Sequence, residues 1–140
     1  MTVAMTEQAP LMLAPDAERI EAMARAVLAT IPEPFAAHLS DVVLLVEEFA
    51  DDATLDAMGI EDPFELTGLY HGRPVGEKSA FDGVTLPDRI HLYRRPLLDE
   101  WVDTGVALDA LIRHVVIHEV GHHFGLSDDD MHALEDAAGP

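Results

Sequence analysis

The sequence predicts an α+β domain, in which a small mixed sheet of about three or four strands packs on an N-terminal helix and on a long helix near the C-terminus, followed by a short C-terminal helix. Three observations predict this class. Of the 140 residues, 49% are hydrophobic, enough for one folded domain with a real core. Apolar residues recur at helical spacing over residues 16–31 and 104–124. Short β-branched and aromatic runs lie between these two segments.

The expected organisation is a flexible N-terminal arm over residues 1–15 and a single domain over residues 16–140. The arm carries two prolines and no sustained periodicity, so a disordered tail is the default expectation. An arm folded across the functional site is the alternative. Asp16 is expected to cap the first helix, and Pro32 and Pro34 are expected to stop it.

The middle of the chain predicts two strands, a helical turn and a long loop. Residues 41–47 form an apolar run between charged ends, which predicts a strand buried on both faces. A single helical turn is expected at residues 54–58, with Gly59 as its stop. Residues 66–71 predict a second strand. Residues 72–88, rich in Gly and Pro, predict a loop that could form the rim of a cleft.

A third strand is expected over residues 89–94, ended by Pro96. Alternation places Ile90 and Leu92 on one face of it and His91 and Tyr93 on the other. His71 and His91 could be ligands of a second metal, but we expect half-buried strand residues because their spacing forms no metal motif. Four acidic residues follow the first strand: Glu47, Glu48, Asp51 and Asp52. We expect them to be solvated turn residues, with an acid/base dyad as the alternative.

The long helix is expected to end in the run HEVGHHFGLSD, which begins at His118. Two histidines four positions apart, His118 and His122, project from one helix face and can reach a single ion. Glu119 points off that line, far enough to stay out of the metal shell and hold a water beside it. Gly125 can adopt a left-handed conformation that turns the chain back, so that Asp128 could supply a third ligand.

The assignment of Asp128 has a structural competitor. Ser127 can cap a last short helix, with Asp130 completing an acidic capping box, and Asp128 would then be only a carboxylate at a helix start. Its spacing from Gly125 favours the ligand interpretation, with Asp129 as the alternative ligand. His114 lies one turn before His118, but helical drift places it beside the ligands or on the surface.

These residues carry a resemblance to a known group. The pattern HExxHxxGxxD resembles that of the zincin metallopeptidases, specifically the metzincin-like branch in which Asp replaces the third His. A family of small bacterial single-domain zinc metallopeptidases is similar over about residues 31–136. The similarity is carried by three segments: Ile60–Leu66, Leu86–Pro96 and His118–Met131. The resemblance implies a minimal zincin-like fold, a bound Zn²⁺ and peptide hydrolysis.

The resemblance also implies parts of a substrate site. In zincins a sheet edge runs beside the active-site helix and pairs with substrate backbone, and residues 89–94 are the candidate; an ordinary protected edge strand is the alternative. Hydrolysis at such a metal would, by its chemistry, also call for a second oxyanion donor, for which the candidates are Tyr93, Tyr70 and His123. We expect instead that the two tyrosines are packing residues and that His123 is a partly exposed neighbour.

One residue departs from the metzincin pattern. Met131 follows Asp128 after only three positions, earlier than the methionine of a metzincin Met-turn. We therefore expect it to be a core residue that packs with Leu134.

The charge composition limits the partners. The net charge is −19, from eight basic and twenty-seven acidic residues, and such a surface repels nucleic acids and anionic membranes. Solubility explains this acidity most simply, with steering of basic peptides as the alternative. The chain has no cysteine, so thiolate ligands and disulfides are excluded. Its apolar run at residues 11–14 is too short for a signal peptide or membrane helix. We expect a cytoplasmic monomer.

The sequence therefore predicts a zinc-dependent peptidase. His118, His122 and Asp128 would hold the metal, and Glu119 would act as general base toward a metal-bound water and then protonate the leaving amine. The substrate would be a peptide or flexible protein segment. The alternative is a non-catalytic zinc-binding or protein-interaction domain that retains the site for stability.

Overall fold

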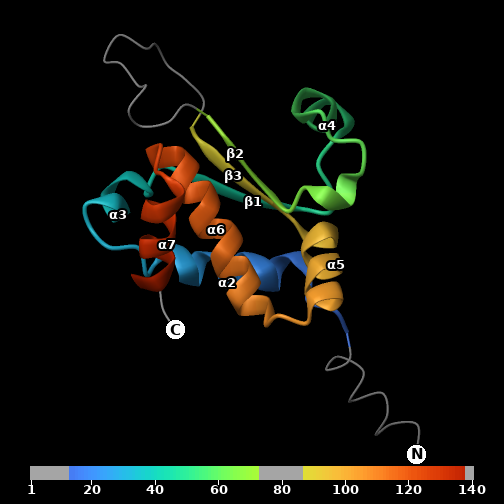
Figure 1. Cartoon of the computed structure of the whole chain (residues 1–140), viewed down its shortest axis with the longest axis horizontal. Coiled ribbons are helices and arrows are strands. Elements are labelled where there is room, and N and C mark those ends of the chain that lie inside the picture. Colours follow the sequence, from blue (N-terminus) through green and yellow to red (C-terminus); the bar gives the residue numbers. More distant parts are fainter. Residues whose placement is uncertain (1–12, 73–86, 138–140) are drawn as a thin grey trace, which may run out of the picture.

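The computed structural model describes residues 13–72 and 87–137. These residues form six α-helices and a three-stranded mixed sheet, so the predicted α+β class is confirmed (Figure 1). Most of the expected arm, residues 1–12, and most of the expected loop, residues 73–86, lie outside the described residues.

The first helix, α2, spans Ala17–Leu28 and begins as predicted. The Asp16 side chain caps it by accepting a hydrogen bond of 2.8 Å from the backbone N–H of Arg19. Ile20 and Ala24 are fully buried on its inner face. A short helix, α3, follows at Phe35–His38.

The three strands lie in the order β1-β3-β2. β1 spans Val43–Glu47 and runs parallel to β3, Arg89–Tyr93, while β2, Gly68–His71, runs antiparallel to β3. The third strand in sequence is therefore central, and the expectation that residues 89–94 form a sheet edge is wrong. β3, the central strand, is buried on both faces. Ile90 and Leu92 are fully buried on one face, and Tyr93 is 2% exposed on the other.

β1 lies at an edge and is not buried on both faces, which corrects a second expectation. Leu44 is buried, whereas Val43 and Glu47 are exposed. Helix α2 packs on one face of this strand. β2 forms the opposite edge of the sheet and contacts the long helix α6 (Leu108–Phe124).

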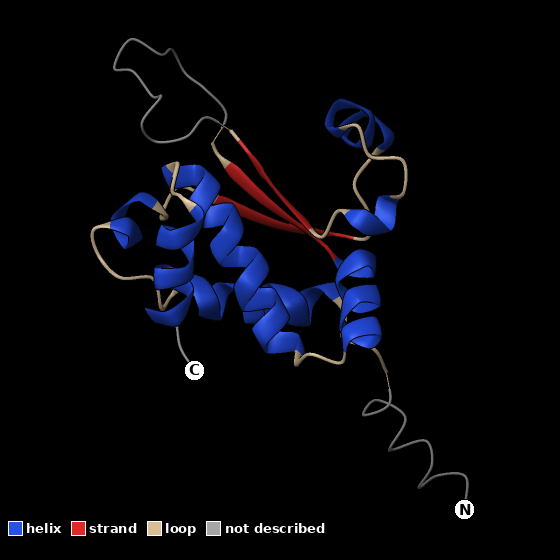
Figure 2. Cartoon of the chain, viewed as in Figure 1, coloured by secondary structure: helices blue, strands red, loops and turns tan. Residues whose placement is uncertain are grey.

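The principal core lies between the sheet and the helices α2 and α6, which pack on one another (Figure 2). Ile90, Leu92 and Val116 are fully buried there, and each such side chain stabilises the fold by about 1.5–3 kcal/mol. The last helix, α7 (Asp128–Ala137), packs on α6. Figure 1 shows α7 beside the C-terminal end of α6.

A smaller core occupies the opposite face of the sheet. Helix α4 spans Asp52–Met58 and ends at Gly59, whose φ of 69° confirms the predicted left-handed stop. A single 3-10 turn, η2, follows at Pro63–Glu65. Leu55 of α4 packs with Tyr93 in this second cluster.

Helix α5, Arg94–Thr104, was not expected. Pro96, interpreted from sequence as the end of a strand, is the third residue of this helix. Proline is tolerated in the first turn because its missing N–H would have no partner there. Gly105, with a φ of 73°, ends α5, and α6 begins at Leu108.

Candidate metal centre

The C-terminal end of α6 is closed by Gly125 in the left-handed conformation, with a φ of 69°. The backbone N–H of Leu126 then donates to the carbonyl oxygen of Gly121 at 2.8 Å, which reverses the chain. Ser127 Oγ accepts from the N–H of Asp130 at 3.2 Å and caps α7. The turn predicted from Gly125 and the cap predicted from Ser127 are both present.

His118 and His122 lie side by side on one face of α6. Their ring centroids are 5.0 Å apart, with the ring planes at 70°. His118 is half-buried, and 47% of the His122 side chain is exposed. Two adjacent imidazoles on a packed helix have the chemistry and placement of zinc ligands.

Glu119 is directed toward the sheet and is only 6% exposed. Its Oε1 accepts a hydrogen bond of 2.7 Å from the backbone N–H of Tyr70 in β2, and His122 Nδ1 lies 3.2 Å from the same oxygen. When Nδ1 of His122 carries the proton toward this carboxylate, Nε2 is the ring nitrogen that can bind a metal.

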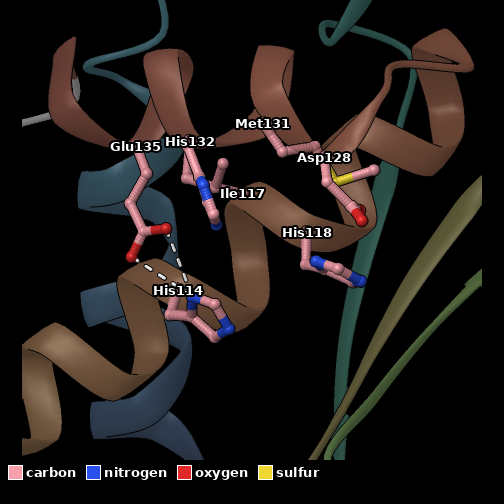
Figure 3. Close-up of a pocket in the computed structure, with 7 residues that line it drawn as sticks. All are labelled: His114, Ile117, His118, Asp128, Met131, His132 and Glu135. Atoms are coloured by element: carbon pink, nitrogen blue, oxygen red, sulfur yellow. Dashed lines mark hydrogen bonds and ion pairs between the residues drawn. The ribbon is translucent and has the colours of Figure 1, made fainter.

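Asp128 stands at the start of α7 and is exposed. It shares with His118 the lining of a pocket of about 240 Å³ between α6 and α7 (Figure 3). His122 is not part of this lining. In the described part of the chain, no three His, Asp or Glu side chains are gathered closely enough to hold a metal as they stand. Imidazole and carboxylate groups suit zinc, but Asp128 does not lie beside the two histidines in this arrangement.

Two more histidines line this pocket. His114 is exposed, and its Nδ1 lies 3.2 Å from both carboxylate oxygens of Glu135 in α7. This agrees with the expected place beside the ligands or on the surface. His132 lies four residues after Asp128 on α7 and points toward α6 in Figure 3. It belongs to no motif in the sequence, and only its helical spacing from Asp128 could have indicated it.

His123 does not have the partial exposure expected from sequence. It is 2% exposed, and its Nδ1 lies 3.3 Å from Oδ2 of Asp88, itself 7% exposed. The ring of Tyr70 packs edge-on against His123, with centroids 5.6 Å apart. Sequence reasoning missed Asp88, because nothing in its local run connects it with a helix residue thirty-five positions later.

Tyr93 is a packing residue, as expected. It is buried in the small core, and its ring stacks on His91 with centroids 6.1 Å apart. Burial, followed by the charges of Glu47, Asp51 and Glu119, raises the pKa of Tyr93 to about 12. The phenol therefore stays neutral at ordinary pH.

Three of the acidic residues at the end of β1 and just after it have partners in the fold. Glu47 Oε1 lies 2.6 Å from His91 Nδ1, and Glu48 pairs with Arg94 at 2.9 Å. Asp51 caps α4, and hydrogen bonds from Thr54 hold the pKa of this carboxyl below its usual value. These partners favour structural roles over an acid/base dyad, although Glu47 lies in β1 and not in the expected turn.

The two strand histidines differ in exposure. His91 is half-buried as expected, whereas His71 is exposed, so that expectation is wrong for His71. Their ring centroids are 6.2 Å apart beside a polar cavity of about 210 Å³.

Met131 is buried, as is Leu134, in agreement with a core role. Its side chain lies directly over Gly121 of α6, where a Cβ would come within 2.6 Å of its Cγ and Sδ. Because position 121 has no side chain, Met131 of α7 can lie directly against the backbone of α6.

The sequence matches a known protein family. The model of a family described as zincin-like metallopeptidase matches residues 39–138, from just before β1 to just beyond the end of α7. The comparison with curated proteins found no match. No helix in the described ranges is both long and apolar enough to span a bilayer.

Proposed function

Because the chain belongs to the zincin-like metallopeptidase family, we propose that it is a zinc-dependent peptidase with its active site on α6. One observation carries the proposal: His118 and His122 lie together on one face of a buried helix, and Glu119 adjoins His122 from the neighbouring face. Ligands on a packed helix keep a more constant geometry than ligands on a loop.

We assign zinc binding to His118, His122 and Asp128. When bound, zinc supplies a Lewis acid that acidifies water and polarises the substrate carbonyl. Asp128, in the first turn of α7, lines the same pocket as His118, which supports it as the third ligand.

Glu119 is the general base of the proposed reaction. Its carboxylate accepts a proton from the attacking water and passes it to the leaving amine, so that the peptide bond breaks without a covalent enzyme intermediate. The hydrogen bond from Tyr70 holds this side chain in one orientation. The fixed orientation lowers the cost of bringing the base to the reacting atoms.

We propose a peptide or a flexible protein segment as substrate, cleaved by a cytoplasmic monomer. The net charge of −19 disfavours nucleic acids and anionic membranes and attracts basic segments. A chain without cysteines gains nothing from an oxidising compartment.

A peptide-library assay tests the proposal, with wild type and Glu119→Gln compared at measured zinc content. We expect about one zinc per chain in both proteins, cleavage by wild type, and a loss of at least about 100-fold in Glu119→Gln. Equal cleavage by the two zinc-loaded proteins would contradict the assignment of Glu119, and no cleavage by wild type would contradict the peptidase.

One observation favours the alternative of a non-catalytic zinc-binding or protein-interaction domain. Glu119 is bonded to Tyr70 and adjoins His122, so its presence is explained structurally even without catalysis. Such a domain would cleave nothing in the library and would lose much of its thermal stability on chelation.

A further inference from the structure

We propose that Asp88 and His123 form a buried positioning pair, which fixes the last turn of α6 and thereby directs His122 toward the metal. The inference rests on the proposed function, because it assigns these residues a task at the same zinc site.

Both members of the pair are buried. Nδ1 of His123 lies 3.3 Å from Oδ2 of Asp88, and the two residues are 2% and 7% exposed. A histidine and a carboxylate this close and this deeply buried interact more strongly than a solvated pair. Removing one of them would leave the other as a buried polar group without this interaction, which costs stability.

Asp88 is itself tied to all three strands. It immediately precedes β3, and its carbonyl oxygen accepts a hydrogen bond of 2.9 Å from the N–H of Val43 at the start of β1. Its carboxylate lies so close to Gly72, just after β2, that a Cβ there would collide with Oδ1. The backbone of Asp88 is therefore held by the sheet, and its carboxylate is packed against Gly72 on one side.

Helical geometry connects this anchor with the candidate ligands. Glu119 and His123 are four residues apart and share the face of α6 that meets β2, where Tyr70 contacts both through its N–H and its ring. His118 directly precedes Glu119, and His122 directly precedes His123. The two candidate ligands therefore lie on a helix face rotated by about 100° from the one that meets β2. Holding His123 against Asp88 therefore sets the direction of His122.

Zinc affinity separates this role from simple stabilisation. Asp88→Asn keeps the shape of the side chain but removes its charge, and His123→Leu removes the ring nitrogens. His123→Asn keeps a donor near the position of Nδ1 and serves as the rescue. The matched control is Leu97→Ala, which opens the core at a fully buried residue on α5, far from the last turn of α6 (Figure 1).

Zinc affinity is measured by competition with a chromophoric chelator, and site geometry by the visible spectrum of the cobalt-substituted protein. We expect zinc to bind about 10–100-fold more weakly to Asp88→Asn and His123→Leu, with an altered cobalt spectrum, and His123→Asn to recover most of the affinity. Leu97→Ala should lose stability but keep wild-type zinc affinity and spectrum.

Wild-type affinity and spectrum in both Asp88→Asn and His123→Leu would overturn the positioning role and leave the proposed function standing. An equal loss of affinity in Leu97→Ala would also overturn it. Failure of wild type to bind zinc would overturn the proposed function and this inference together. If Asp88→Asn does not fold, the comparison of His123→Leu with His123→Asn decides by the same measurements.

Discussion

The backbone N–H of Tyr70, on the edge strand β2, donates a hydrogen bond of 2.7 Å to Oε1 of Glu119 on α6. The side chain that we assign to proton transfer therefore also fastens the long helix to the sheet. Substitutions at this position affect folding as well as chemistry, and the two effects can be separated by the choice of replacement.

Glu119→Ala should be less stable than Glu119→Gln. The glutamine amide oxygen can still accept from the N–H of Tyr70, whereas alanine leaves that partly buried donor without its acceptor. We expect the free energy of unfolding of Glu119→Ala to be about 1–3 kcal/mol lower than that of Glu119→Gln. Urea unfolding in the presence of a chelator measures this difference without any contribution from metal. Equal stability of the two variants would show that the hydrogen bond contributes little.

Asp128 and Asp129 provide a matched test of the third ligand. Both lie in the first turn of α7, where each carboxylate should gain about 0.3–1 kcal/mol from the helix dipole. Asp128→Asn and Asp129→Asn should therefore lose similar stability without metal. Isothermal titration with zinc should show at least about a tenfold weaker affinity only for Asp128→Asn. The reverse result would transfer the ligand to Asp129.

Gly68→Ala should disturb the contact between β2 and α6. A Cβ at this position would lie 2.7 Å from Cγ1 of Val115 and 3.3 Å from the carbonyl oxygen of His91. We expect a loss of about 1–3 kcal/mol, because helix or strand must shift. Val115→Ala removes the closer atom, so the double variant should show a favourable coupling of about 0.5–3 kcal/mol in a double-mutant cycle. Additive losses would place the strain at the His91 carbonyl.

Tyr93 should make the protein less stable at high pH. Its pKa rises from 10.0 to about 12 on folding, so the native state retains a proton that the unfolded state releases. The stabilisation is complete below pH 10 and is lost as pH rises through 12, by about 3 kcal/mol for two pKa units. Urea unfolding between pH 9 and 12 should show this loss in wild type and not in Tyr93→Phe. Parallel curves for the two proteins would contradict the shift.

Features that depend on neighbouring residues could be predicted from the sequence. Asp16, Gly59, Gly125 and Ser127 end or begin helices through contacts within a few residues, and each acts in the predicted place. The helical spacing of the apolar residues likewise located α6. These signals are local, so a single sequence contains them.

Features that depend on residues distant in the chain could not be predicted from the sequence. The central place of β3 results from its pairing with strands on either side, which the strand's own sequence does not specify. Pro96 is compatible with a strand end and with a first helical turn, and only the surrounding packing decides between them. The burial of His123 required knowledge of Asp88, which reaches it only in the folded chain.

The strand order also has a consequence for how the chain folds. β1 and β2 both precede β3 in sequence, yet among the described residues each pairs only with β3. During synthesis neither strand finds its partner until Tyr93 has left the ribosome, and joining Val43 to Arg89 closes a long loop at an entropic cost. Sheet formation should therefore be a late and slow step, and a nascent chain stalled before Arg89 would expose two unpaired strands that are prone to aggregate.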